Sequence, residues 1–410
     1  MVGRYDCSQA NCAVNPSYLR RFENRRSERC QIARSPAGSR SIGASEDRGT
    51  LRRVTQAQAR GGHARVLNLD LVERDRLDEA ASFVVDLLER PGSDIHVLEG
   101  QLGLDEALVV PGHPDAFELS PVASIDPGIV WAVDGGSCTV ADGRSFQVAA
   151  FRAARVRFAG GETVAVERPQ LDVRAVAPEE MARLARVTLT ELCGAEPERL
   201  PELPRPVDAL REWAEWGEVG RTVRDAGPGD LVLVDGSLHG GPLVPQTVVH
   251  RVHEEAVARG VSLAGVVKAS TLYWGRNAPL VTLLKRRGDR EVGASRWAAR
   301  ISTDPVFGRL YVGDIFVAHL APTAPHAFRV DVARGPAPAD EVLGRLAALA
   351  DDPAFVGYPY PLARAHQAAR VTGYDVVDVR RSFREALSRR GIAEDDVELL
   401  FQDFHEVLNR

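Results

Sequence analysis

Two stretches of the sequence run from a row of apolar residues directly into an aspartate followed by glycine and serine. The first is IVWAVDGGS, which contains Asp134, and the second is LVLVDGSL, which contains Asp235. A run such as Leu231 to Val234, apolar at every position, predicts a strand buried on both faces, as central parallel strands are. Open α/β sheets bind their ligands at the carboxyl ends of such strands. If the two strands are neighbours, the two carboxylates offer a divalent metal ion the hard oxygen ligands it needs.

Each motif taken alone has a simpler interpretation as a turn. Asp-Gly after a strand is a leading signal for a hairpin turn, and serine is also a common turn residue. The near-identical form of the two copies favours a shared chemical role. The two interpretations are compatible, because a carboxylate that projects from a turn can still bind a metal ion.

The elements around the two motifs predict how the strands are ordered. In chain order, strands or helices are expected at residues 129–133, 145–158, 162–171, 178–193, 207–224, 231–234, 246–260 and 262–270. Their types follow the order β-β-β-α-α-β-α-β. A three-stranded meander, followed by right-handed crossovers that add parallel strands beside the first, is the ribonuclease H-like arrangement. We therefore expect an α/β fold with a mixed sheet flanked by helices, in which Asp134 and Asp235 lie on adjacent strands.

A third carboxylate is expected from the helix that precedes the second motif. Glu212, Glu215 and Glu218 follow one another there at three-residue intervals. Helical periodicity places Glu218 closest to the apolar face of this helix, with Glu215 next and Glu212 facing away. The alternative is a solvated acidic face with no chemical role.

Two basic side chains are further candidates for the site. His366 follows GYPYP on a predicted helix, where it could be a late metal ligand or position a water molecule, although an isolated histidine is more often structural. Lys268 is one of only two lysines among 51 basic residues, which suggests that a compact ammonium group is needed there, with chance as the alternative. The sequence has neither the GxxxxGK[ST] loop of ATP-binding proteins nor a GxGxxG after a strand.

The composition is that of an ordinary globular protein. The 410 residues, 44% hydrophobic and 26% charged, suffice for two or three domains with a large core. We find no apolar run long enough to span a membrane and no secretory signal at the N-terminus. The five cysteines are an odd number and form no disulfide framework or zinc motif, so we expect a cytoplasmic protein.

The N-terminal segment differs in charge from the rest of the chain. Residues 1–65 contain 13 arginines and five acidic residues, a balance of +8, so the remaining chain carries −14 of the total of −6. This segment lacks periodicity, and we expect a disordered basic arm that could contact nucleic-acid phosphates. A translation start assigned too far upstream would give the same pattern. Residues 66–120 are expected to form a helical region, with a helix over residues 67–88.

The chemistry-bearing segments together resemble the NurA family of nucleases. AVDGGS, the acidic helix with REWAE, LVLVDGSL, GVVKAS and GYPYPLARAH occur in this order over about residues 120–375. The resemblance implies a ribonuclease H-like core and a homodimer. It also implies Mn²⁺-dependent 5′-to-3′ exonuclease and single-strand endonuclease activity on DNA, with Mg²⁺ as a second metal to consider. The implied partner is a HerA-type hexameric ATPase that moves DNA in double-strand break end resection, and the missing ATP-binding loop agrees with this division of labour.

The resemblance also assigns roles to residues of this sequence. Asp134 and Asp235 match the two metal-binding aspartates, and Glu215 within REWAE matches the family's helix glutamate, in preference to the position that periodicity favours. His366 matches the late histidine, so the four would hold the metal. Lys268 is expected to contact the scissile phosphate. The Gly-Ser after each aspartate is expected to let DNA approach.

The nuclease domain would then span residues 121–410, with its core at about 125–270 and an extension at 271–410. Two other hypotheses remain open from the sequence. One is a ribonuclease H-like nuclease directed at RNA, and the other is a non-catalytic subunit that docks on the ATPase.

Overall fold

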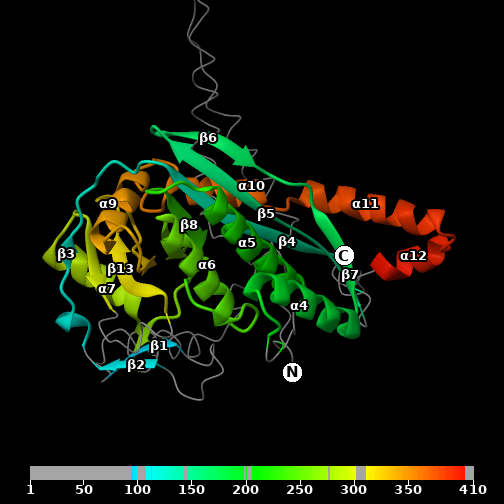
Figure 1. Cartoon of the computed structure of the whole chain (residues 1–410), viewed down its shortest axis with the longest axis horizontal. Coiled ribbons are helices and arrows are strands. Elements are labelled where there is room, and N and C mark those ends of the chain that lie inside the picture. Colours follow the sequence, from blue (N-terminus) through cyan, green and yellow to red (C-terminus); the bar gives the residue numbers. More distant parts are fainter. Residues whose placement is uncertain are drawn as a thin grey trace, which may run out of the picture. The chain divides into compact units, whose positions relative to one another are not determined.

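The two aspartates lie on neighbouring strands of one large mixed sheet (Figure 1). The computed structural model describes residues 94–98, 108–111, 113–142, 146–197, 200, 206–275, 278–301 and 311–401, all within a compact unit that spans residues 83–410. The basic segment 1–65 and the helix expected over residues 67–88 lie outside the described residues.

The large sheet contains ten strands. In spatial order, nine of them are β3 (Ser120–Pro121), β12 (Trp297–Arg300), β13 (Gly313–His319), β14 (Phe328–Ala333), β9 (Ser262–Val267), β8 (Leu231–Asp235), β4 (Val130–Asp142), β5 (Gln147–Ala159) and β6 (Glu162–Glu167). The tenth, β7 (Asp172–Val176), pairs with the first half of β5, whereas β6 pairs with the second half. Strands β4, β8 and β9 are parallel neighbours, which confirms the predicted meander and crossovers.

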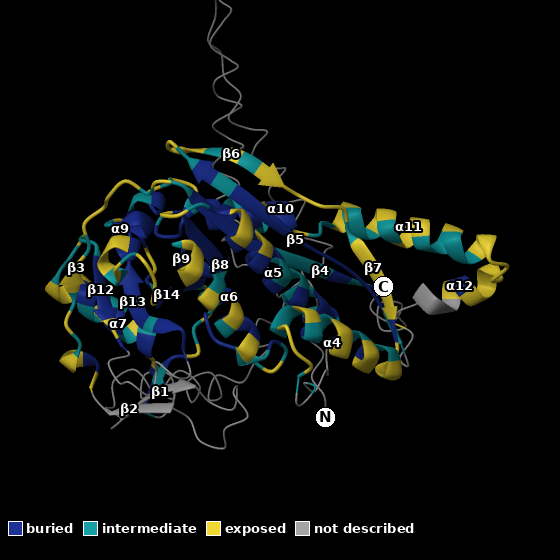
Figure 2. Ribbon diagram, viewed as in Figure 1, coloured by how far each residue is buried: buried dark blue, intermediate teal, exposed yellow. Residues whose placement is uncertain are grey.

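Helices cover both faces of the parallel strands. They are α4 (Pro178–Cys193), α5 (Pro206–Asp225) and α6 (Gln246–Arg259) on one face, and α9 (Ala339–Leu349) and α10 (Tyr360–Ala369) on the other. Alternate residues of a strand point to opposite faces. Accordingly, Trp131 and Val133 of β4 pack toward α5, while Val130 and Ala132 pack toward α10. The central strands are buried and the outward sides of α4 and α6 are exposed (Figure 2).

One buried arginine fixes the beginning of the two central parallel strands. Arg345 of α9 is 5% exposed, and its guanidinium donates to three backbone carbonyls. The acceptors are Pro127 (2.7 Å) and Ile129 (3.0 Å) before β4, and Gly229 (3.0 Å) before β8. These three bonds tie the beginnings of the two strands to α9. The Ile129 carbonyl also accepts from the Leu231 N–H (3.1 Å).

The described part of residues 66–120 consists of residues 94–98, 108–111 and 113–120, so the expected helical region stays a prediction. It contains β1 (Asp94–Leu98), β2 (Leu108–Pro111), the short 3₁₀ helix η1 (Pro114–Ala116) and the first residue of β3. Strands β1 and β2 form a separate four-stranded sheet with β10 (Tyr273–Trp274) and β11 (Ala278–Pro279). This region is therefore completed by strands from far along the chain.

The remaining differences from the expected elements concern short or interrupted segments. The strand expected over residues 162–171 is shorter in the structure, where β6 ends at Glu167. Strands β7 and β12 and helix α7 (Leu280–Glu291) were not predicted. The described part of the chain ends with α11 (Gly373–Arg389) and α12 (Glu394–Phe401). None of the described helices is both long and apolar enough to cross a membrane.

Candidate active site

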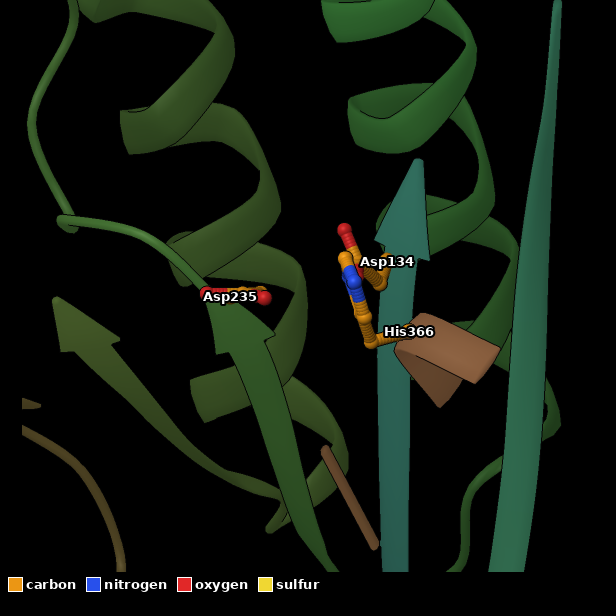
Figure 3. A group of neighbouring side chains, drawn as sticks. All are labelled: Asp134, Asp235 and His366. Atoms are coloured by element: carbon orange, nitrogen blue, oxygen red, sulfur yellow. The ribbon is translucent and has the colours of Figure 1, made fainter. Parts of the chain in front are cut away.

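The pairing of β4 with β8 places the two aspartates side by side. The parallel register runs from Val130 opposite Leu231 to Val133 opposite Val234 and then ends, so Asp134 and Asp235 are the next residue on each strand. Strand alternation turns both side chains toward the face covered by α10. Figure 3 shows the Asp235 side chain extending toward Asp134 from the end of its strand.

Only the second of the two motifs is a turn. Asp235 is the last residue of β8, and Gly236 follows it with φ of 150°, a conformation that favours glycine. Asp134, in contrast, lies inside the 13-residue strand β4, which continues through Gly135 and Gly136 paired with β5. The carboxylate is at the end of the parallel pairing with β8, although it is not at the end of its own strand.

His366 reaches Asp134 from α10. Its Nδ1 lies 2.6 Å from Oδ2 of Asp134, and its side chain is 33% exposed. One ligand atom each from Asp134, Asp235 and His366 lies within 4.8 Å of the others, and this is the group of potential metal ligands found among the described residues (Figure 3). The three residues are brought together from β4, β8 and α10, across 232 positions of sequence between the first and the last.

The C-terminal end of α10 is held against the β4–β5 hairpin. Arg152 of β5, 7% exposed, donates from Nε to the Ala369 carbonyl (3.1 Å) and from Nη2 to the Arg370 carbonyl (2.8 Å). Gly136 lies opposite Arg152 in the register, and a Cβ there would overlap the Ala369 carbonyl. His366 is in the last turn of this helix, so these contacts set its position.

The glycines after Asp134 therefore make room for helices. A Cβ on Gly135 would lie 2.9 Å from Oε2 of Glu215 and 3.0 Å from Cγ of Arg211, both on α5. Helix α5 thus packs closely against β4 at Gly135 on one face of the sheet, and α10 packs closely at Gly136 on the other face. The expectation that the first Gly-Ser admits DNA is thus not met for Gly135 and Gly136. Nothing lies within 4 Å of a Cβ on Gly236 in the second motif.

Of the three glutamates considered on α5, Glu215 is the one beside the aspartates. It is 4% exposed, and Arg211 donates to its Oε2 from Nη1 (3.2 Å). Glu218 is also buried, but it forms ion pairs with Arg155 (3.4 Å) and Arg221 (3.1 Å) away from the aspartates. Glu212 is bound to Nη2 of Arg211. The structure thus brings Glu215 to Asp134 and directs Glu218 elsewhere.

The clustered carboxylates perturb one another. Burial raises the pKa of Glu215 well above its ordinary value, the charges of Asp134 and Asp235 add to this, and Arg211 opposes it. Burial and the charge of Asp134 raise the pKa of Asp235 to about 6, against the opposing effects of Lys268 and His366. Carboxylates whose ionised forms are this unfavourable are what a bound cation would stabilise.

Lys268 is the second basic group at the aspartates. It directly follows β9, and its Nζ forms an ion pair with Oδ2 of Asp235. The ring of Tyr358 lies 5.4 Å from the same ammonium group. Tyr360, the other tyrosine of the YPYP segment, lies edge-on to Phe158, with ring centroids 6.2 Å apart. All five residues proposed from the sequence are therefore at or next to this centre, and its remaining basic group, Arg211, was not singled out.

The donor set suits a hard divalent cation. Two carboxylates and an imidazole converge within 4.8 Å, and a third carboxylate lies beside them in a buried setting. Oxygen ligands with one imidazole are typical of Mg²⁺ and Mn²⁺ sites. Burial is the main cause of the raised pKa of Asp235, and the charge of Asp134 adds to it. The residues present therefore fit such an ion.

The fold is ribonuclease H-like. Its mixed sheet has β4, β8 and β9 as parallel neighbours, helices flank the sheet, and carboxylates lie on the adjacent strands β4 and β8. Among solved structures, the chain is similar to the NurA nuclease from Sulfolobus solfataricus, with a TM-score of 0.51 and 16% identity over 80% of this chain and 98% of the other. The architecture is thus that of a NurA nuclease. At this identity the likeness establishes a common fold.

Two further structures are more distantly similar. NurA bound to dAMP and manganese gives a TM-score of 0.41 at 9% identity, over 86% of this chain and 99% of the other. Human ENDOV gives 0.31 at 13% identity, over 61% and 90%. No protein-family model and no curated protein sequence matches the chain.

Proposed function

We propose that the chain is a divalent-metal-dependent nuclease that hydrolyses phosphodiester bonds of DNA. The observation that carries this proposal is the convergence of Asp134, Asp235 and His366, whose ligand atoms lie within 4.8 Å of one another. Asp134 and Asp235 lie where the parallel pairing of β4 with β8 ends, which is the edge at which a sheet of this kind binds its ligands. The shared fold with a NurA nuclease supports the reaction class.

In this proposal, Asp134, Asp235 and His366 hold the ion. Glu215, which the sequence resemblance predicts as a fourth ligand, supplies a third carboxylate beside them. The ion supplies the charge that stabilises a phosphodiester oxygen and lowers the pKa of a bound water. Lys268, one-third exposed and next to Asp235, is placed to bind a phosphate oxygen. The burial of Asp134 and Glu215 excludes bulk water from the acidic side of the centre.

The finer assignments come from the resemblance of the sequence segments to the NurA family. We propose Mn²⁺ as the preferred ion with Mg²⁺ as a substitute, and 5′-to-3′ exonuclease and single-strand endonuclease activities. We also propose that a homodimer acts with a HerA-type hexameric ATPase in the end resection of double-strand breaks. ATP-dependent acceleration of DNA degradation in a mixture of the two proteins would test the partnership.

The central test is digestion of labelled linear DNA by the purified chain with Mn²⁺, Mg²⁺ or a chelator. We expect cleavage with either ion and none with the chelator, and loss of cleavage in D134A and D235A. E215Q and E218Q are a matched pair on one helix, because both glutamates are buried but only Glu215 contacts the centre. E215Q is expected to lose at least tenfold in rate, and E218Q to keep its rate below its melting temperature.

Each outcome has a definite meaning. Undiminished cleavage by a pure D134A/D235A double variant would contradict the proposed mechanism. Preferential digestion of RNA in a parallel reaction would identify an RNA-directed nuclease. Failure of the folded wild-type chain to release nucleotides from DNA with either ion would indicate a non-catalytic docking subunit.

A further inference from the structure

A third basic residue, Arg211 of α5, neutralises part of the acidic centre. Its Nη1 lies 3.2 Å from Oε2 of Glu215, and its Nη2 lies 3.1 Å from Oε1 of Glu212. The charges of Asp134 and Asp208 also act on this guanidinium. An arginine remains charged under all ordinary conditions, so it is a permanent cation at this position.

Arg211 and the three potential metal ligands lie on opposite sides of β4. Asp134 points toward α10, where His366 lies, whereas the next residue, Gly135, faces α5. The missing side chain of Gly135 is what allows Glu215 and Arg211 to contact the strand, with Cγ of Arg211 only 3.0 Å from where a Cβ would be. The ligand atoms that converge within 4.8 Å do not include those of Glu215.

Arg211 neutralises part of the negative charge on the α5 side of the centre. Asp134, Asp235 and Glu215 carry three negative charges when ionised, and one of the two oxygens of Glu215 is already bound to Arg211. Two-metal nucleases place their ions about 3.5–4 Å apart, with shared carboxylates between them. A second ion on the α5 side would lie next to the Arg211 guanidinium, and the repulsion between the two cations would oppose its binding.

We propose that Arg211 takes the place of a second metal ion, so that the chain binds a single divalent ion, at Asp134, Asp235 and His366, when no nucleic acid is present. This inference rests on the proposed divalent-metal centre and adds its stoichiometry. It assigns Arg211 a role in charge compensation that neither Lys268 nor His366 can fill, since those two contact the aspartates on the other side of the strand.

The experiment counts Mn²⁺ bound to the metal-free full-length chain at pH 7.5, by titration calorimetry and by the electron paramagnetic resonance signal of the free ion. We expect one ion for the wild-type chain, two for R211Q and R211M, and one for R211K, which keeps the positive charge. R221Q is the matched control, because Arg221 is on the same helix and pairs with Glu218 outside the centre, and we expect it to bind one ion.

Both neutral variants are expected to fold, because Arg211 is partly exposed and its two ion pairs are with residues of its own helix. A wild-type chain that binds two ions overturns the inference without any variant. One ion in both the wild type and a folded R211Q or R211M overturns it as well, and leaves the metal-dependent nuclease intact. A folded wild-type chain that binds no Mn²⁺ contradicts the proposed metal centre itself.

Discussion

Substitution of Asp235 by asparagine should stabilise the metal-free protein while it removes the metal site. The ionised carboxylate of Asp235 is buried next to Asp134, and its pKa is raised from 3.8 to about 6. Asparagine has nearly the same shape and stays neutral at every pH. The substitution therefore mimics the protonated aspartic acid, which is the form that folding favours relative to the unfolded chain.

The size of the effect follows from the linkage between protonation and folding. A group whose pKa is higher in the folded than in the unfolded chain loses stability as the pH rises through that window. From the two values for Asp235, 3.8 and about 6, the ionised carboxylate lowers the free energy of unfolding by about 1 kcal/mol at pH 4.5 and about 3 kcal/mol at pH 7.5. The attraction of Lys268 is already contained in the raised pKa. Unfolding gains about 2 cal/mol/K of entropy per residue, so the stability difference of about 3 kcal/mol between D235N and the wild type at pH 7.5 corresponds to roughly 4 °C in melting temperature.

The assay is thermal unfolding of the wild type and D235N at pH 4.5 and pH 7.5 in the presence of a chelator. D235N should melt higher at pH 7.5, and the difference should shrink at pH 4.5. Saturating Mn²⁺ should reverse the order at pH 7.5, because the ion stabilises the wild type alone. D172N, an exposed aspartate on β7, is the control and should change the melting temperature little at either pH. A metal-free D235N that melts below the wild type at pH 7.5 would refute the reasoning.

Three contacts that position the centre should also be sensitive to substitution. G136A should lower the free energy of unfolding by about 1–3 kcal/mol, because its Cβ would overlap the backbone of α10. The control is G241A, whose Cβ would meet no atom within 4 Å and which should leave the stability unchanged. Thermal melts of both variants measure the difference. R345M should lower the free energy of unfolding in urea by about 3 kcal/mol, since three backbone carbonyls at the start of β4 and β8 lose their bond to the guanidinium. R152M should weaken Mn²⁺ binding in calorimetry, because it releases the end of the helix that bears His366, and an unchanged affinity would show that Arg152 does not position this helix.

The sequence predicted the fold best where the local hydrophobic pattern of a strand reflects its position in the sheet. A strand that is apolar at every position must be covered on both faces, and this alone predicts that β4 and β8 are central and parallel. Once they are neighbours, Asp134 and Asp235 meet at the same edge. Periodicity favoured Glu218 over Glu215, but both are buried in the folded chain, so burial does not distinguish the residue at the centre. The choice depends on β4 and β5, where Gly135 leaves space for Glu215 and Arg155 offers Glu218 a charge.

The elements that the sequence did not predict depend on contacts with distant segments. Helix α7 contains Gly288, a residue that usually argues against a helix, but here a Cβ would overlap the ring of Trp297 on β12. The glycine is required by packing against a strand that follows the helix. Strands β3, β10 and β11 have two residues each, too few for any periodic signal, and they form only because a partner strand lies beside them.

The metal-free centre is held together by the basic groups that surround it. Asp134 contacts His366, Asp235 contacts Lys268, and Glu215 contacts Arg211 of its own helix, so each carboxylate has a basic partner. The first two contacts involve groups that we propose to bind the metal ion or a phosphate, so both must rearrange when these ligands arrive. The Arg211 contact lies on the other face of β4 and can persist. The centre therefore has two basic partners that ligands can displace, His366 and Lys268, and one permanent cation, Arg211, on the other face of β4. This arrangement suits the binding of one divalent ion and the release of Lys268 toward a substrate phosphate.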